Sequence, residues 1–271
     1  MTLRLLTYLA PSLPATLFEA LAAHLGTELA EDVELRFDPT RSGPRPGESE
    51  PFTSGEVDLA FVCATSYVWL TSGATRAVEL VGAAWVPTDP RAAGEARYFG
   101  DVLTKFDGPE TLANLAGRRV AYNDEVSLSG YHSLRLALAA AGIAVADVAL
   151  VRSGSHLRSL ELLLGGEVDA AAIDSNVWRR RLRTDPAVGA GRLRPIAALG
   201  PHPVQPLVAR AGLPPELTRA VRTACLLAHD SAAGPALRDA ELARFVKVDD
   251  AHYASLRAEL AELGCDGAVT A

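Results

Sequence analysis

The chain alternates between two hydrophobic patterns. Short apolar runs that suit buried strands are separated by segments in which apolar residues recur at helical spacing, as in Leu17, Phe18, Leu21 and Leu25. We expect strands at residues 2–8, 33–37, 55–63, 78–86, 118–123, 148–152, 168–174, 193–199 and 245–248. We expect helices at residues 13–26, 68–72, 107–117, 131–141, 155–164, 176–183, 214–229, 241–245 and 251–263. Strands that alternate with helices predict an α/β fold with mixed, mostly parallel sheets flanked by helices.

One short sequence occurs twice. Gly-Glu-Val-Asp stands at residues 55–58 and again at 166–169, each time before an apolar strand. This recurrence is either chance, since such a turn commonly precedes a strand, or the mark of two lobes built alike. Each strand ends in polar residues, at 65–67 and 174–176. Because ligands bind beyond the carboxyl ends of strands in open α/β sheets, we favour two lobes that face each other across a cleft.

Composition and charge narrow the functional classes. The 271 residues are 49% hydrophobic and 22% charged, which is typical of globular proteins. A net charge of -7 argues against nucleic acid as a partner, although helix N–H groups can bind a small anion at any net charge. The three widely spaced cysteines, and the lack of zinc or nucleotide motifs, predict no metal and no cofactor.

The start of the chain bears on location. The residues after Met1 do not show the pattern of an export signal, which is a charged segment followed by a long apolar segment and a cleavage site. No run of ~18 apolar residues predicts a membrane span. We therefore expect a cytoplasmic protein from the chain as written, or a periplasmic or cell-surface one if the start is trimmed.

The strongest candidate site is the strand–loop–helix segment that contains Ser127, Leu128, Ser129, Gly130 and Tyr131. The first turn of a helix offers unpaired N–H groups, the serines add hydroxyl donors, and glycine allows close approach of a ligand. These features suit phosphate, phosphonate, sulfate or carboxylate. A plain N-terminal cap is the alternative, and on the motif alone it is favoured.

Other polar residues follow strands and could complete the site. His156 begins another helix, where it could donate to an anion or simply be solvated. Asp174 ends an apolar strand and needs a partner, so it could bind a ligand or cap the next helix. In the facing lobe, Thr65, Ser66 and Tyr67 are hydroxyl donors or the cap of a short helix. Tyr8, at the end of the first strand, is also a candidate ligand-binding residue.

Three segments carry a family resemblance: GEVDLAFVCATSYVWL, LAGRRVAYNDEVSLSGYHSLR and GSHLRSLELLLGGEVDAAAID. In this order they resemble the phosphonate-binding group of periplasmic solute-binding proteins, which have the two-lobed type II fold. In that family a Ser-Thr-Ser-Gly-Tyr turn grips the anion, and here Leu128 replaces the middle hydroxyl. The resemblance further implies binding roles for His156, Asp174, Tyr67 and Tyr98, although the Gly-Pro that precedes the family tyrosine is absent before Tyr67.

The resemblance also implies an organisation and a function. Lobe I would comprise residues 1–88 and 196–271, and lobe II residues 89–195, with hinge crossovers near 86–98 and 190–198. The protein would bind a small anionic solute as the substrate-binding component of an ABC transporter, with a permease as partner, as a monomer and without catalysis. The alternatives are a cytoplasmic lyase similar to chorismate dehydratase, with His156 and Asp174 as its acid and base, or an intracellular ligand sensor.

Overall fold

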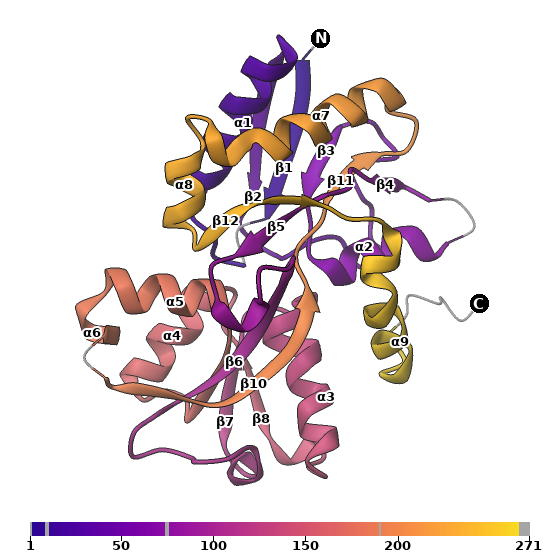
Figure 1. Ribbon diagram of the computed structural model, residues 1–271. Helices are drawn as coiled ribbons and strands as arrows, with labels where there is room; N and C mark the ends of the chain where they lie inside the picture. Colours follow the sequence, from indigo (N-terminus) through magenta and orange to yellow (C-terminus); the bar gives the residue numbers. More distant parts are fainter. Residues whose placement is uncertain (1, 9–10, 74–75, 190, 266–271) are drawn as a thin grey trace.

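The computed structural model describes residues 2–8, 11–73, 76–189 and 191–265, and Figure 1 shows two lobes joined by crossing strands. The first lobe has a five-stranded sheet in the order β2-β1-β3-β11-β4. Its strands are β2 (Asp32–Asp38), β1 (Thr2–Tyr8), β3 (Leu59–Phe61), β11 (Leu207–Arg210) and β4 (Val78–Leu80). The second lobe has the order β10-β6-β9-β7-β8. Its strands are β10 (Leu193–Pro203), β6 (Arg97–Lys105), β9 (Ala170–Asp174), β7 (Arg119–Tyr122) and β8 (Ala149–Arg152). A separate pair joins β12 (Leu242–Lys247) to β5 (Ala83–Pro87).

Both large sheets are mixed. In the first lobe β1 is parallel to β2 and β3, whereas β11 is antiparallel to β3 and β4. In the second lobe β7 is parallel to β8 and β9, whereas β6 is antiparallel to β9 and β10. The expected mixed α/β architecture is therefore confirmed, with parallel pairing in half of each large sheet and not in most of it.

The repeated Gly-Glu-Val-Asp unit has the same geometry in both lobes. The Asp58 N–H donates to the Arg4 carbonyl, and the Asp58 carboxylate accepts the Arg4 N–H, each at 3.0 Å. Asp169 and Arg119 make the same reciprocal pair, at 2.8 Å in both directions. The aspartate thus aligns an incoming strand beside its parallel neighbour, which supports a shared structural unit as the cause of the recurrence.

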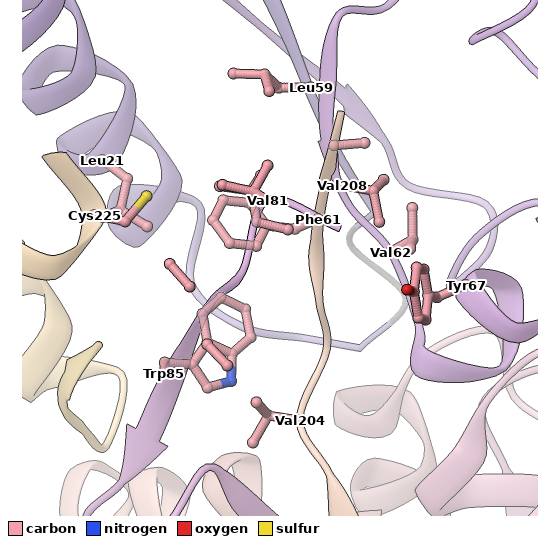
Figure 2. Packing of buried hydrophobic residues seen from close by; sticks show 14 of the residues in the cluster. Leu21, Leu59, Phe61, Val62, Tyr67, Val81, Trp85, Val204, Val208 and Cys225 are labelled. Atoms are coloured by element: carbon pink, nitrogen blue, oxygen red, sulfur yellow. The ribbon is translucent and has the colours of Figure 1, made fainter. Parts of the chain in front are cut away.

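The first lobe has one large hydrophobic core, part of which is shown in Figure 2. On one side α1 (Ala15–Leu29), α7 (Pro215–Leu227) and α8 (Gly234–Asp239) supply Leu21, Cys225 and other apolar residues. At its centre the Phe61 ring stacks on Trp85, with 5.1 Å between centroids. On the other side lie α2 (Ala64–Ser72) and α9 (Ala254–Glu262).

The second lobe has a core on each face of its sheet. Successive side chains of β9 point in opposite directions, so Ala170 and Ala172 join one core while Ala171 and Ile173 join the other. The first core is covered by α3 (Ser133–Ala140). The second is covered by α4 (His156–Gly165), α5 (Ser175–Thr184) and α6 (Pro186–Gly189). Helices therefore cover both faces, as the sequence pattern predicted.

Several expected elements differ from the structure. The helix expected at 241–245 is wrong, because Glu241 has a φ of 60° and Leu242 begins β12, whose pairing with β5 buries Phe245. The helix expected at 107–117 shrinks to a 3₁₀ turn at Leu112–Leu115, closed by a capping box of Thr111 and Asn114. The helix expected at 68–72 begins earlier, at Ala64.

The chain passes between the lobes twice. It leaves the first lobe after β5 and enters β6, and it returns only after Pro203, because β10 stays paired with β6 to that residue. The hinge crossovers expected near 86–98 and 190–198 stay predictions. Among the residues that the structure describes, none of the helices combines the length and apolar character that a membrane crossing requires.

Candidate functional site between the two lobes

The segment expected to bind an anion forms a π-helical turn, Leu128–His132, that continues into α3. The Ser127 hydroxyl accepts the Gly130 N–H at 3.1 Å, so this serine does act as the N-terminal cap. The N–H groups of Tyr131 and His132 both donate to the Ser127 carbonyl. Isolated π turns are frequent at functional sites, so the cap and a binding role are compatible.

Two N–H groups of this turn face side chains rather than backbone carbonyls. Burial raises the pKa of the Cys63 thiol, and the hydroxyl and N–H of Thr65 and then the Leu128 N–H act in the opposite direction. Burial likewise raises the pKa of Tyr98, against hydrogen bonds from the hydroxyl and the N–H of Ser129. The free helix start is therefore enclosed by Cys63 of the first lobe and Tyr98 of the second.

Gly130 is packed so closely that no side chain fits there. A Cβ atom at this position would lie 2.1 Å from Asn123 Oδ1 and 3.0 Å from His156 Cε1. His156 Nε2 also lies 3.4 Å from Ser129 Oγ, so the expected histidine does adjoin the turn. Burial lowers the pKa of His156 to about 3, and at neutral pH its ring can donate one N–H but carries no charge.

Asp174 lies at the end of β9 and is completely buried. Its Oδ1 accepts the Asn176 N–H at 2.8 Å, which caps α5, and its Oδ2 accepts from Gln205 Nε2 at 3.3 Å. Burial raises the pKa of Asp174 to about 7. Within the described part of the chain no hydrogen bond joins Asp174 to His156, so the acid–base pair of the lyase alternative has no support in the geometry.

The three hydroxyl residues of α2 point in different directions. Thr65 donates to the Val126 carbonyl and so reaches the turn from the facing lobe. Ser66 donates to the Pro44 carbonyl at 2.8 Å, and Tyr67 donates to Asp250 at 2.5 Å, so both face away from it. The half-buried ring of Tyr131 lies 4.8 Å from that of Tyr122.

The sequence analysis missed a clamp between the lobes. Ser42 donates to the Asp124 carboxylate and accepts from Asn123 Nδ2 at 3.3 Å. At the rim, Arg45 forms an ion pair with Glu125 at 2.6 Å. The sequence of residues 41–51, with three prolines and two glycines, predicts only a loop and does not indicate which residues of the other lobe it contacts.

Tyr8 lines a small cavity of the first lobe, together with Thr7, Trp85, Gln205 and the turn's neighbour Cys63. Thr7, Trp85 and Gln205 were not candidates in the sequence. Thr7 and Trp85 lie within apolar runs that read as strand cores. The signal that could have found Gln205 is its position as a lone amide among apolar and proline residues where the chain returns to the first lobe.

Comparison with solved structures gives similar folds throughout. A binding-protein component of an ABC phosphonate transporter from Pseudomonas aeruginosa has a TM-score of 0.79 at 18% identity, over 99% of this chain and 89% of that one. PhnD1 from Prochlorococcus marinus, in complex with methylphosphonate, has a TM-score of 0.78 at 18% identity, over 97% and 98%. MatC from Rhodopseudomonas palustris, with bound malate, has a TM-score of 0.64 at 15% identity, over 98% of each chain.

A search of curated proteins finds no match. A family model described as "ABC transporter, phosphonate, periplasmic substrate-binding protein" matches residues 5–253. A family of this kind binds small anions for a transporter, so the lyase alternative is not favoured. It is also periplasmic, which supports the periplasmic location considered above, whereas the cytoplasmic location expected from the chain as written has no support. The chain therefore belongs to the family of periplasmic substrate-binding proteins of ABC phosphonate transporters.

Proposed function

We propose that the chain binds a phosphonate or phosphate group against the turn Ser127–Gly130, between the two lobes. The observation that carries this proposal is the pair of N–H groups on Leu128 and Ser129. They stand at a buried helix start, beside the Cys63 thiol and Tyr98. N–H groups at a helix start attract anions, and a phosphonate oxygen is a far better acceptor than a thiol.

The grip on the anion is made by neutral donors. Leu128 lacks a hydroxyl and its side chain is buried in the first-lobe core, but its backbone N–H remains in place. The Ser129 hydroxyl, Tyr98 and neutral His156 surround the same point. The nearby Arg45 is paired with Glu125 at the rim, so we expect hydrogen bonds, not an arginine, to hold the anion.

The role we propose is capture and delivery without chemistry. The lobes would hinge where the chain passes between the sheets, and an anion in the cleft would favour the closed form. A permease would then recognise the closed, monomeric protein in the periplasm. His156 and Asp174 would shape the cleft rather than transfer protons, since no hydrogen bond joins them among the residues that the structure describes.

Titration calorimetry with methylphosphonate and phosphate tests the site. We expect Ser129→Ala to weaken binding about tenfold or more, since a hydrogen bond to a charged group contributes ~1.5–3 kcal/mol. Ser231→Ala is the control, because it also removes one serine hydroxyl near a helix start, but this hydroxyl lies near α8 and accepts the Ala233 N–H at 3.1 Å. Unchanged affinity in Ser129→Ala, or no response of the unmodified protein to any oxyanion, would overturn the proposal.

A further inference from the structure

The small cavity of the first lobe directly adjoins the proposed anion site. Its volume is about 10 Å³, which is room for about one water molecule. Cys63 connects the two places, because this residue lines the cavity and its thiol receives the Leu128 N–H of the turn. A substituent on an anion held at the turn would therefore extend toward this cavity.

Four buried polar atoms around the cavity have no hydrogen-bond partner within the described residues. They are Thr7 Oγ1, Tyr8 OH, Trp85 Nε1 and Gln205 Oε1. The exposed fractions of these residues are 1%, 3%, 1% and 6%. Leaving a buried polar atom unpaired is unfavourable, and an indole N–H can be satisfied only by an acceptor.

Trp85 cannot turn its N–H elsewhere. Its ring stacks on Phe61 at an interplanar angle of 20°, and it also meets the edge of Phe245 with 6.1 Å between centroids. In Figure 2 the indole nitrogen lies on the side of Val204, the neighbour of Gln205 in the chain. The donor is therefore held in a fixed direction by the hydrophobic core.

The cavity is uncharged. Its lining contains hydroxyls, one amide, one thiol and apolar side chains, but no lysine, arginine, aspartate or glutamate. The Asp174 carboxyl is not part of the lining and is engaged by Gln205 and the Asn176 N–H. An ammonium group in the cavity would meet no carboxylate and would leave the Trp85 N–H without an acceptor.

We propose that this cavity is a subsite for the substituent of the bound phosphonate, and that it selects a short, uncharged group that accepts a hydrogen bond, such as a hydroxymethyl group. The inference rests on the proposed function, since the anion must first be held at the turn. The ligand's hydroxyl would accept from Trp85 Nε1 and pair with the hydroxyls of Thr7 and Tyr8.

Calorimetric titration with three phosphonates tests the subsite. We expect hydroxymethylphosphonate to bind about three to ten times more tightly than methylphosphonate, the range that one net hydrogen bond provides, and aminoethylphosphonate to bind most weakly. Trp85→Phe keeps the aromatic packing and removes the N–H, so the preference for the hydroxyl should fall to about onefold. Trp69→Phe is the matched control, because the Trp69 N–H donates to the Cys265 carbonyl outside the cavity and its loss should leave the preference unchanged.

Thr7→Val is a second variant of similar shape, and it should also reduce the preference for the hydroxyl. It tests the subsite even if Trp85→Phe does not fold. Equal binding of the hydroxymethyl and methyl ligands would overturn the subsite, as would a full preference in both cavity variants. Tighter binding of aminoethylphosphonate would also overturn it and would point to Asp174 instead. These outcomes differ from failure of the proposed function, in which all three phosphonates fail to bind.

Discussion

Replacing Asp174 with asparagine should stabilise the unliganded protein, and should do so only above the acidic range. The carboxyl is completely buried, and burial raises its pKa from 3.8 to about 7. A folded-state pKa above the unfolded value means that the folded protein holds the proton more strongly. The stability that the protonated Asp174 carboxyl contributes is therefore fully present below about pH 4 and is lost as the pH rises to about 7.

The size of this effect follows from the same values. A rise in the pKa of Asp174 from 3.8 to about 7 corresponds to a free-energy difference of ~4 kcal/mol, because one pKa unit equals about 1.36 kcal/mol. Asparagine keeps the shape and cannot ionise, so it should escape this loss. Its amide can also pair with Gln205, because the Gln205 Oε1 atom is unpartnered among the described residues and can face it after an amide flip.

The assay is urea unfolding of both proteins without ligand, at about pH 4, 5.5, 7 and 8. We expect the unmodified protein to lose up to about 4 kcal/mol relative to Asp174→Asn between the two ends of this series. Asp32→Asn, at an exposed carboxyl that begins β2, should follow the unmodified protein. Parallel stability profiles for Asp174→Asn and the unmodified protein would refute the reasoning.

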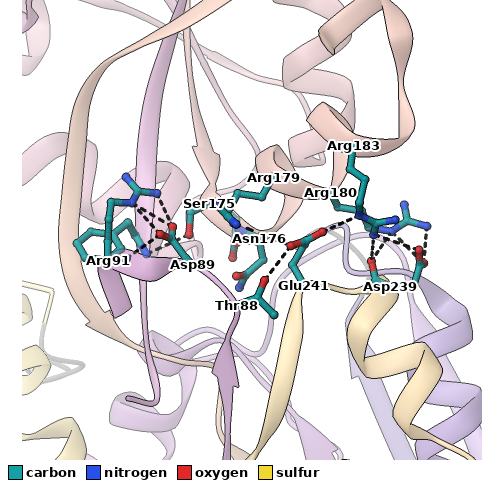
Figure 3. A network of polar contacts seen from close by, with 12 residues as sticks. Thr88, Asp89, Arg91, Ser175, Asn176, Arg179, Arg180, Arg183, Asp239 and Glu241 are labelled. Carbon is teal, nitrogen blue, oxygen red and sulfur yellow. Dashed lines mark hydrogen bonds and ion pairs between the residues drawn. The ribbon is translucent and has the colours of Figure 1, made fainter. Parts of the chain in front are cut away.

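Two further predictions concern the turn and the closed form. Gly130→Ala should lower the free energy of unfolding in urea by about 1–3 kcal/mol and abolish phosphonate binding, because its Cβ would collide with Asn123 Oδ1 at 2.1 Å. Gly165→Ala should be tolerated, because its Cβ would lie 3.6 Å from its nearest neighbour. Arg180 of α5 forms an ion pair at 2.8 Å with Asp239 of α8, across the two lobes (Figure 3). Arg180→Gln should therefore weaken phosphonate binding up to about fivefold at ~20 mM salt, and little at ~500 mM salt, which screens the pair. Arg158→Gln breaks pairs with Glu161 and Glu167, both in the same lobe as Arg158, and should have no such effect. Equal losses in the two variants would contradict a role in closure.

The sequence predicted the fold from features that are local. Apolar periodicity located α1, α4 and α7, and the repeated Gly-Glu-Val-Asp unit indicated two similar lobes because it aligns a strand beside its neighbour in each. The segment 241–245 was misassigned because its strand pairing with β5 is contributed by residues more than 150 positions away. Such a partner is invisible to a local pattern.

The site was predicted less completely for the same physical reason. Ser129, Gly130 and His156 could be found because each stands at the start of a helix after a strand. Trp85 and Thr7 could not, since they read as ordinary strand core, and only the folded arrangement shows that their polar atoms lack partners. Tyr67 matched a family position, yet its hydroxyl is held by Asp250 on the far side of α2.

Under the proposed function, ligand binding and lobe closure would share one segment of the chain. Residues 123–126 receive the contacts of the first lobe, through Ser42 on Asp124 and Thr65 on the Val126 carbonyl, and the proposed anion turn begins at the next residue, Ser127. An anion that orders this turn would therefore also position the groups that the first lobe meets. Conversely, closure would bring Thr65 onto the Val126 carbonyl beside the turn and would shield the anion from water, which strengthens its hydrogen bonds. If the two steps stabilise each other, removing the Ser42 hydroxyl should weaken the binding of phosphate, which has no substituent that could reach the cavity Ser42 also lines.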